Sequence, residues 1–273
     1  MKKYLYFLIV IYCTTALYAY SDSDLDGVED AYDKCPNTPL SDLVDTTGCS
    51  IESLISPHHY DILIGLAYAN SDYQTLNQTD TLSTSLQADY YYKDFSLQFN
   101  TAYFTTSGDG YSDNGFYDTS LGASYGWTQN DVILRVGVGV ILPTYDNTLS
   151  NNKSDLFGSV NLSYSYEKFN FFGGYSYTLI RDDDYSDANI SVAYQNTNAY
   201  SIGLGYYFNY KLYTSATFNS SKSIYVGVED VQTATLYGYY SIDEHYFGTL
   251  SYAYGISESA SSNYIALRVG YYF

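Results

Sequence analysis

Five aspartates near the start of the chain have the spacing of a loop that could hold a metal ion. In residues 22–33, DSDLDGVEDAYD, acidic side chains occupy positions 1, 3, 5, 9 and 12, and Gly27 occupies position 6. Calcium prefers about six to eight hard oxygen ligands, and a turning loop directs alternate side chains to one point. Glycine permits the sharp turn that such a loop needs. The spacing therefore predicts a set of carboxylate ligands: Asp22, Asp24, Asp26, Asp30 and Asp33.

The surroundings of this loop narrow the kind of module to which it belongs. The spacing is close to that of an EF-hand, but Cys35-Pro36 follows at once, so a pair of flanking helices is not expected. The whole segment, from the acidic loop through CPNTP at 35–39 to Gly48-Cys49, resembles a bacterial thrombospondin type 3 repeat. The resemblance implies Ca²⁺ as the cofactor, the Val28 carbonyl as a backbone ligand and a Cys35–Cys49 bond. The alternative is a solvated acidic segment that binds no metal.

Residues 1–19 have the features of a secretory signal. Lys2 and Lys3 give a basic start, an apolar run follows, and small residues precede position 20. The apolar run is too short for a transmembrane helix. Tyr12 is bulky where lipoprotein processing at Cys13 requires a small residue, which disfavours a lipid-anchored chain. We therefore expect three parts: the signal at 1–19, the calcium-binding repeat at 20–55 and a larger domain at 56–273.

The composition limits the environment and the partners. An even number of cysteines in the exported chain suggests one disulfide, between Cys35 and Cys49. The net charge of −19 becomes more negative when a signal containing Lys2 and Lys3 is removed. This balance argues against nucleic acid as a partner and fits the attraction of cations. Tyrosine occurs 38 times, which a disordered chain would not predict and a membrane-interface belt would.

From Tyr60 onward the chain alternates between apolar and polar residues, which predicts strands with one apolar face. Five connections are short: Tyr92-Lys93-Asp94, Gln129-Asn130-Asp131, Glu167-Lys168, Asn209-Tyr210-Lys211 and Asp243-Glu244-His245. Six are long and rich in Asp, Asn, Ser and Gly: 70–80, 105–115, 143–154, 181–198, 219–230 and 255–263. Together they predict about twelve strands, with both ends of the domain on the short-turn side. Fourteen strands is the alternative, in which residues 190–194 form a further strand rather than part of a tall hairpin.

The last eleven residues indicate the kind of sheet that these strands form. Phe273, Tyr271 and Val269 continue one apolar face, while Arg268 lies on the other. A chain that ends on such a strand resembles bacterial outer-membrane β-barrels, whose terminal Phe is part of the signal read by the barrel assembly machinery. An even strand number with short periplasmic turns is typical of this class. The resemblance implies an all-β, transmembrane, antiparallel up-and-down barrel in the outer membrane, with the repeat in the periplasm.

Further features bear on this interpretation and its alternative. Aromatic residues gather beside the short turns, as in an interfacial girdle. In lipid the backbone must form all its hydrogen bonds from strand to strand, so the sheet should close. A secreted β-sandwich with surface tyrosines is the alternative, but it does not explain the terminal Phe together with the regular order of short and long turns.

The inward face of the predicted barrel is mostly Ser, Thr, Gly, Asn and Gln, with four charges: Asp89, Asp118, Arg135 and Arg268. Twelve strands enclose a wider space than the eight-stranded barrels whose side chains nearly fill the interior. Arg135 and Arg268 could steer anions or polar solutes, or form salt bridges that brace the wall. Four inward aromatic side chains could instead block the passage: Tyr91, Phe104, Phe172 and Tyr207.

The long connections carry much of the acid, and one cluster is the densest: Asp182, Asp183, Asp184 and Asp187. Carboxylates around a pore mouth concentrate cations. Alternatively, these loops form a hydrated surface that binds divalent ions together with neighbouring lipopolysaccharide.

The histidines argue against a hydrolase. His58, His59 and His245 all fall at the predicted periplasmic rim, and no serine gains a base that would activate it. We therefore expect no enzyme, but a porin-like outer-membrane channel for small polar or cationic solutes with a periplasmic, calcium-stabilised repeat. The alternative is a closed barrel that acts as a surface adhesin, a receptor or a structural anchor.

Overall fold

The computed structural model of the 273-residue chain describes residues 22–24, 27–38, 42, 44–50, 57–72, 78–145, 153–186 and 191–273. The predicted signal at 1–19 lies outside these residues. The chain divides into two compact units, Met1–Ile55 and Ser56–Phe273. Within the described ranges, no helix is long and apolar enough to cross a membrane.

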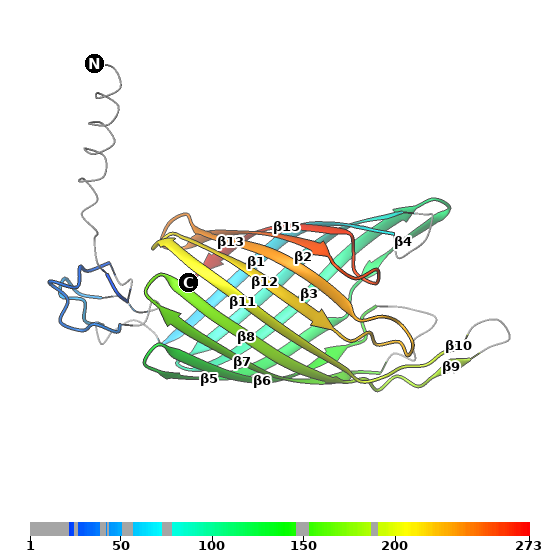
Figure 1. Ribbon diagram of the computed structural model, residues 1–273, viewed down its shortest axis with the longest axis horizontal. Helices are drawn as coiled ribbons and strands as arrows, with labels where there is room; N and C mark the ends of the chain where they lie inside the picture. Colours follow the sequence, from blue (N-terminus) through cyan, green and yellow to red (C-terminus); the bar gives the residue numbers. More distant parts are fainter. Residues whose placement is uncertain are drawn as a thin grey trace, which may run out of the picture. The chain divides into compact units, whose positions relative to one another are not determined.

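The larger unit consists of antiparallel strands (Figure 1). Its described residues form β1 (His58–Ser71), β2 (Thr79–Tyr92), β3 (Phe95–Gly108), β4 (Tyr111–Phe116), β5 (Thr119–Gln129), β6 (Val132–Leu142), β7 (Asp155–Tyr166), β8 (Phe169–Leu179), β9 (Tyr185–Ser186), β10 (Ser191–Val192), β11 (Thr197–Asn209), β12 (Leu212–Ser221), β13 (Val231–Ser241), β14 (Tyr246–Gly255) and β15 (Asn263–Tyr272). All of these strands except β4, β9 and β10 form the wall of a barrel, each paired with the next. The prediction of twelve wall strands is confirmed.

The wall closes between its first and last strands. β1 pairs with β15, with Asp61 opposite Tyr272. Beyond the end of β15, the backbone N–H of Tyr60 donates to Phe273 O at 2.8 Å, and Phe273 N–H donates to Tyr60 O at 3.0 Å. Because β2 also pairs with β3, no edge strand is left in the wall. In a closed sheet the backbone N–H and C=O groups of every strand form hydrogen bonds with the neighbouring strands. This is the condition for crossing a lipid bilayer.

The short turns gather at one end of the barrel, where β1 begins and β15 ends (Figure 1). Each of the five predicted short connections is found between wall strands. In three of them the first residue after the strand has a positive φ: 53° at Lys93, 53° at Asn130 and 52° at Glu167. This conformation belongs to the two-residue hairpin turns whose twist matches that of the flanking strands. Both ends of the domain therefore lie on the short-turn side, as predicted.

The opposite end carries two hairpins that extend beyond the wall (Figure 1). The expectation of a loop at 105–115 is wrong, because β3 continues to Gly108 and pairs with β4. The turn contains Gly110 with φ +77°, and Asp-Gly is a strong hairpin signal. In the other hairpin, β9 pairs with β10. Residues 191–194 thus belong to a tall hairpin rather than to a wall strand, as predicted.

The barrel lacks the apolar core of a globular domain. Among the described residues, only four apolar side chains are buried: Leu63, Phe104, Ala260 and Ala266. The outward side chains of the strands are instead apolar and exposed, for example Val138 at 63%, Ile202 at 66% and Leu236 at 61%. An apolar surface of this extent requires an apolar surrounding, which a lipid bilayer provides.

The smaller unit is fastened by covalent and polar contacts. The predicted disulfide joins Cys35 and Cys49. The buried hydroxyl of Thr38 donates to Gly48 O at 2.7 Å, and Val44 and Ser50 form an isolated bridge. Hydrogen bonds from the hydroxyl and the backbone N–H of Thr47 lower the pKa of the Asp45 carboxyl. These contacts hold the segment that follows the acidic loop in a compact shape.

Candidate functional site

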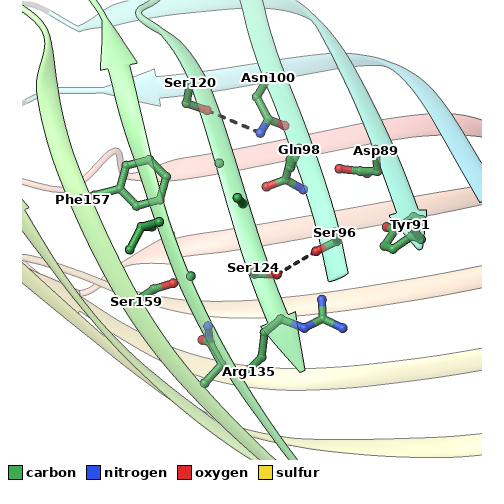
Figure 2. Close-up of a pocket in the computed structure, with 15 residues that line it drawn as sticks. Asp89, Tyr91, Ser96, Gln98, Asn100, Ser120, Ser124, Arg135, Phe157 and Ser159 are labelled. Atoms are coloured by element: carbon green, nitrogen blue, oxygen red, sulfur yellow. Dashed lines mark hydrogen bonds between the residues drawn. The ribbon is translucent and has the colours of Figure 1, made fainter. Parts of the chain in front are cut away.

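The inner wall of the barrel is polar over the strands from β2 to β7. Figure 2 shows Gln98, Asn100 and Arg135 directed into a cavity of about 250 Å³. A second cavity of about 280 Å³ shares Ser159 and Asn161 with the first and continues over β8, β11 and β12. The two cavities thus form a polar stretch of the inner wall rather than one enclosed pocket.

Many lining groups form hydrogen bonds with one another across neighbouring strands. Ser96 Oγ and Ser124 Oγ are 2.7 Å apart, and Asn100 Nδ2 donates to Ser120 Oγ at 3.4 Å (Figure 2). On the next stretch of wall, Asn219 Nδ2 donates to Thr235 Oγ1 at 3.1 Å. These bonds join the side chains of neighbouring strands along the wall.

Two of the four predicted lumen charges, Arg268 and Asp89, are linked through an amide. Arg268 Nη1 donates to Gln87 Oε1 at 3.2 Å, and Gln87 Nε2 donates to Asp89 Oδ2 at 2.6 Å. The side chain of Asp89 is only 5% exposed. Among the described residues, the one ion pair joins Lys153 and Asp183 at the long-loop end, and Arg268 does not take part in it. The direct salt bridge considered for Arg268 is therefore replaced by a contact through Gln87, since the amide can accept from the cation and donate to the carboxylate.

A second lumen carboxylate, which sequence reasoning missed, lies beside Asp89. Asp61 on β1 is directly opposite Asp89 on β2 in the strand register. Directly opposite side chains on one face of an antiparallel pair have Cβ atoms about 5 Å apart. With Asp61 included, the short-turn half of the inner wall carries two carboxylates and the two guanidinium groups of Arg135 and Arg268, while Asp155 has inward parity at the long-loop end of β7. The alternation of β1 could have revealed it, because Asp61 lies between the outward residues Tyr60 and Ile62 and must therefore face inward.

Asp118 occupies a different position from the other three predicted lumen charges. It lies in the connection between β4 and β5, where its side chain is exposed. Its Oδ1 atom accepts a hydrogen bond of 3.0 Å from the backbone N–H of Tyr145. Asp118 therefore ties down the start of the β6–β7 connection at the long-loop end, away from the Arg268–Gln87–Asp89 chain.

Several inward aromatic rings lie on glycines of the neighbouring strand. A methyl group added to Gly203 would overlap the ring of Phe172, and one added to Gly205 would overlap that of Tyr213. The same relation links Gly139 to Phe157 and Gly270 to Phe247. Because each glycine leaves space above the backbone, the ring rests against the wall. These pairs follow from register across strands, so sequence reasoning found only Phe172 among the four rings.

Of the four side chains considered as blocks, three pack against neighbouring rings or a glycine of the wall. Tyr91 lines the first cavity (Figure 2), and the Tyr207 ring lies 4.6 Å from that of Tyr213, centroid to centroid. Phe104 is 5% exposed and lies against two rings near the long-loop end, Tyr117 at 4.6 Å and Tyr145 at 5.6 Å. Phe172 covers Gly203, as described above. These three side chains therefore have packing partners on the wall.

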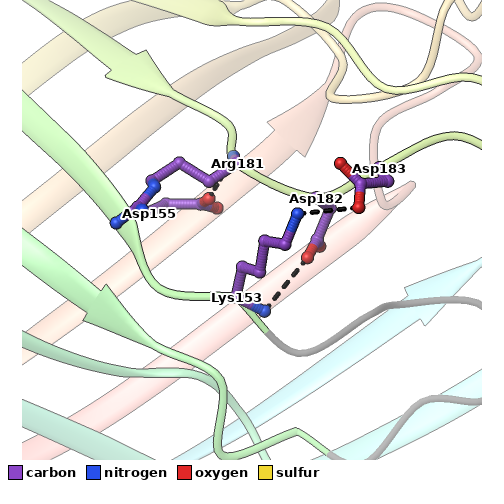
Figure 3. Close-up of polar contacts among 5 residues, drawn as sticks. All are labelled: Lys153, Asp155, Arg181, Asp182 and Asp183. Atoms are coloured by element: carbon purple, nitrogen blue, oxygen red, sulfur yellow. Dashed lines mark hydrogen bonds and ion pairs between the residues drawn. The ribbon is translucent and has the colours of Figure 1, made fainter.

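The acidic cluster after β8 forms specific bonds with the neighbouring connection (Figure 3). Asp183 Oδ2 pairs with Lys153 Nζ at 2.7 Å, and Asp182 Oδ1 accepts from Lys153 N at 3.2 Å. Asp184 Oδ1 accepts from the backbone N–H of Tyr194 at 2.9 Å. The predicted fourth member, Asp187, lies outside the described residues. These carboxylates tie the β8–β11 segment to the β6–β7 connection as well as placing acid at the long-loop end.

The histidines contact aromatic groups at the short-turn end. His58 Nδ1 is 2.6 Å from Tyr90 Oη. The His59 ring stacks on Tyr272 at 5.4 Å, and His245 Nδ1 is 3.1 Å from the carbonyl of Tyr272. Their contacts belong to this rim, on the side where the sequence analysis placed them.

The acidic loop of the smaller unit has features that both favour and limit metal binding. Gly27 has φ +94°, and its N–H donates to Asp22 Oδ2 at 2.9 Å. Asp24 Oδ1 is buried and accepts no hydrogen bond from the described residues. Asp30 and Asp33 accept local hydrogen bonds, from Ser23 and from Cys35 N. No group of three or more possible ligands is brought together in the described ranges, and Asp26 lies outside them.

The predicted assembly signal lies on the outward face of β15 and just beyond it. Val269 is 51% exposed and Phe273 is 48% exposed. The Phe273 ring lies 5.3 Å from that of Tyr271 and stacks on Tyr60 of β1 at 5.6 Å. The terminal residue thus belongs to the seam that closes the barrel.

Comparisons with known proteins agree with this architecture. No model of a protein family matches the chain, and no curated protein sequence matches it. The fold is similar to a crystal structure of an outer-membrane channel from Pseudomonas putida F1, with a TM-score of 0.69 and 10% identity over 80% of this chain and 97% of that one. It is also similar to the NanC porin, with a TM-score of 0.52 and 13% identity over 78% of this chain and 98% of that one. These similarities show that the chain has the fold of outer-membrane β-barrels, a fold that both channels share.

Proposed function

We propose that this protein is a porin-like channel of the outer membrane that passes small polar or cationic solutes. The observation that carries the proposal is the difference between the two faces of the wall. The outward face is apolar, whereas the lumen is lined by Ser, Asn and Gln with its aromatic rings packed onto glycines. A wall of this kind separates water from lipid and leaves a hydrated passage.

The outward aromatic residues support a position across a bilayer. Trp127, Tyr166 and Phe208 are 52%, 56% and 52% exposed near the short turns. Tyr254, at 56%, lies towards the other end. Aromatic side chains at both interfaces are typical of transmembrane barrels. The partners that we propose are therefore membrane lipid, lipopolysaccharide at the long-loop end, and the assembly machinery at the terminal strand.

The charges support polar or cationic solutes rather than anions. The long-loop end carries Asp182, Asp183 and Asp184, of which Asp183 is neutralised by Lys153. Acid at a mouth raises the local concentration of cations. In the short-turn half of the lumen, two carboxylates and two guanidinium groups balance, so this part of the passage does not favour either sign strongly.

The smaller unit is proposed to bind calcium on the periplasmic side. Asp22, Asp24, Asp30 and Asp33 supply hard oxygen atoms, and the buried Asp24 Oδ1 is suited to a cation. Calcium would relieve the repulsion among these acids and stiffen the loop. Isothermal titration of the full mature chain with CaCl₂ tests this. We expect one site that Asp24→Asn abolishes and Asp45→Asn, outside the loop, leaves intact; equal effects of the two variants would contradict it.

Planar-bilayer recording of the refolded mature protein tests the channel. We expect steady single-channel currents with a weak preference for cations, and reversal potentials in a salt gradient give the selectivity. Asp184→Asn is expected to reduce that preference because it removes charge from the long-loop end. A folded, heat-modifiable barrel that carries no current would contradict the proposal and support the closed anchor, adhesin or receptor instead.

A further inference from the structure

The lumen has an aromatic side that the channel proposal does not use. Inward rings from four consecutive wall strands, β11 to β14, lie close together near the short-turn end: Tyr207, Tyr213, Tyr237, Tyr239 and Phe247. We call these residues the aromatic strip. The ring centroids of Tyr207 and Tyr213 are 4.6 Å apart, those of Tyr213 and Tyr237 6.4 Å, and those of Tyr239 and Phe247 5.4 Å. Tyr213 is directly opposite Tyr239 in the register of β12 and β13, which joins the two groups.

Two rings of the strip have one face against the wall and the other available to the lumen. Tyr213 covers Gly205 of β11, and Phe247 covers Gly270 of β15. A ring supported by glycine on one side is held in place without a side chain beneath it. Its other face remains a flat, apolar surface at the edge of the passage. Such rigid rings lose little conformational entropy when a solute stacks on them.

A polar wall lies across the lumen from the strip. In the ring of twelve wall strands, β2 is six positions from β11, β3 six from β12, and β6 six from β14. Asp89, Gln98 and Arg135 on β2, β3 and β6 each lie three residues from the short-turn end of their strand. Tyr207, Tyr213 and Tyr239 lie within two residues of theirs. The two surfaces therefore face each other at similar depth.

This pairing of surfaces selects a kind of solute. A ring with an apolar face would stack on the strip, and its hydroxyl groups would bond to the exposed amide of Gln98 and the exposed guanidinium group of Arg135 opposite. An apolar solute would leave the polar wall unsatisfied, which is costly when water is displaced. A simple ion would gain little, because Asp61 and Asp89 balance Arg135 and Arg268. Neutral saccharides have both the apolar ring face and the hydroxyl groups.

We propose that the lumen contains a binding site for neutral saccharides, formed by the aromatic strip and the polar wall across from it. The inference rests on the proposed channel function and specifies its solute class. Saccharides would bind transiently as they pass, with their rings on the strip.

The test is single-channel recording of the full mature chain with maltotriose, using sorbitol at equal osmolality as a polyol without a pyranose ring. Maltotriose is expected to interrupt the current reversibly and to saturate, whereas sorbitol lowers it only through viscosity. Tyr239→Ala is expected to raise the dissociation constant for maltotriose about five- to tenfold, and Tyr239→Phe is expected to raise it about twofold or less. The matched control is Tyr240→Ala, because Tyr240 is the next residue on the outward face and 49% exposed.

Outcomes separate this inference from the channel proposal. A conducting channel on which maltotriose acts like sorbitol would overturn the saccharide site and leave the channel standing. Equal effects of Tyr239→Ala and Tyr240→Ala would overturn the assignment to the strip. A folded wild-type barrel without current would overturn both proposals. If Tyr239→Ala fails to give a heat-modifiable barrel, Phe247→Ala against Tyr246→Ala repeats the comparison with the same expectations.

Discussion

The inner and outer faces of the barrel use the same residue types for opposite purposes. On the outer face, Tyr240 and Phe208 are exposed and suit the membrane interface. One residue away in each strand, Tyr239 and Tyr207 face the lumen and pack against neighbouring rings. The difference lies in the parity of each position and in the glycines that only inner rings cover. Aromatic content alone therefore says little about whether such a barrel is open.

The largest expected effect comes from placing the same charge on each face of β11. Ile202→Arg puts a guanidinium group in lipid near the middle of the strand and is expected to cost about 2–4 kcal/mol of unfolding free energy. Ser201→Arg puts it in the lumen, where water solvates it, and is expected to change stability by less than about 1 kcal/mol while reducing conductance. Urea unfolding in liposomes measures both. Equal losses would contradict the assignment of faces.

The next effect tests the rings that lie on glycines. Gly203→Ala places a methyl group where the Phe172 ring lies and is expected to cost about 1–3 kcal/mol through overpacking. The displaced ring should enter the passage and lower single-channel conductance. Phe172→Ala in the same background should restore the conductance. An unchanged conductance in Gly203→Ala would show that the ring does not border the open passage.

An effect of similar size is expected from the hydrogen bonds of Gln87. Gln87→Leu removes the amide between Arg268 and Asp89 and leaves a buried carboxylate without that donor. We expect a loss of about 1–3 kcal/mol and a changed cation preference. Leu86→Val, on the outward face of the same strand, is the control and should not alter selectivity. Chemical unfolding and reversal potentials separate the two variants.

The smallest effect on stability is expected from Asp243, which lies in the short turn between β13 and β14. Backbone N–H groups of Tyr246 and His245 donate to Asp243 and lower the pKa of its carboxyl. A depressed pKa means that the folded state binds the proton less readily than the unfolded state. The turn therefore contributes stability above the unfolded pKa of about 3.9, and this contribution is lost as pH falls through the folded pKa. Asp243→Asn should remove this part of the pH dependence, measured as unfolding free energy from neutral to acidic pH.

The strands could be predicted because their signals are local. Alternation and turn chemistry lie within a few residues, so the twelve wall strands and five short turns followed from the sequence. The same local signal existed at Asp109-Gly110, where a hairpin was taken for a loop. Contacts across the wall were harder, because they depend on register. Asp61 became a partner of Asp89, and Gly205 a support for Tyr213, only when neighbouring strands were aligned.

From the sequence, the function could be predicted only from the composition and from the alternation of inward and outward positions along each strand. Polar inward positions and an apolar outward face indicated a channel. The aromatic strip and the polar wall lie on opposite sides of the lumen because β11 and β2 are six positions apart around the closed barrel. No local pattern reports that separation.

Access of a water-soluble reagent to each face tests the central claim that the inner wall borders an open passage. Single-channel current is recorded from Ser201→Cys and Ile202→Cys while a positively charged methanethiosulfonate reagent is added; Cys35 and Cys49 do not compete because they form a disulfide. We predict a stepwise fall in current for Ser201→Cys and none for Ile202→Cys. A Ser201→Cys current that the reagent leaves unchanged, or modification of Ile202→Cys instead, would contradict the account.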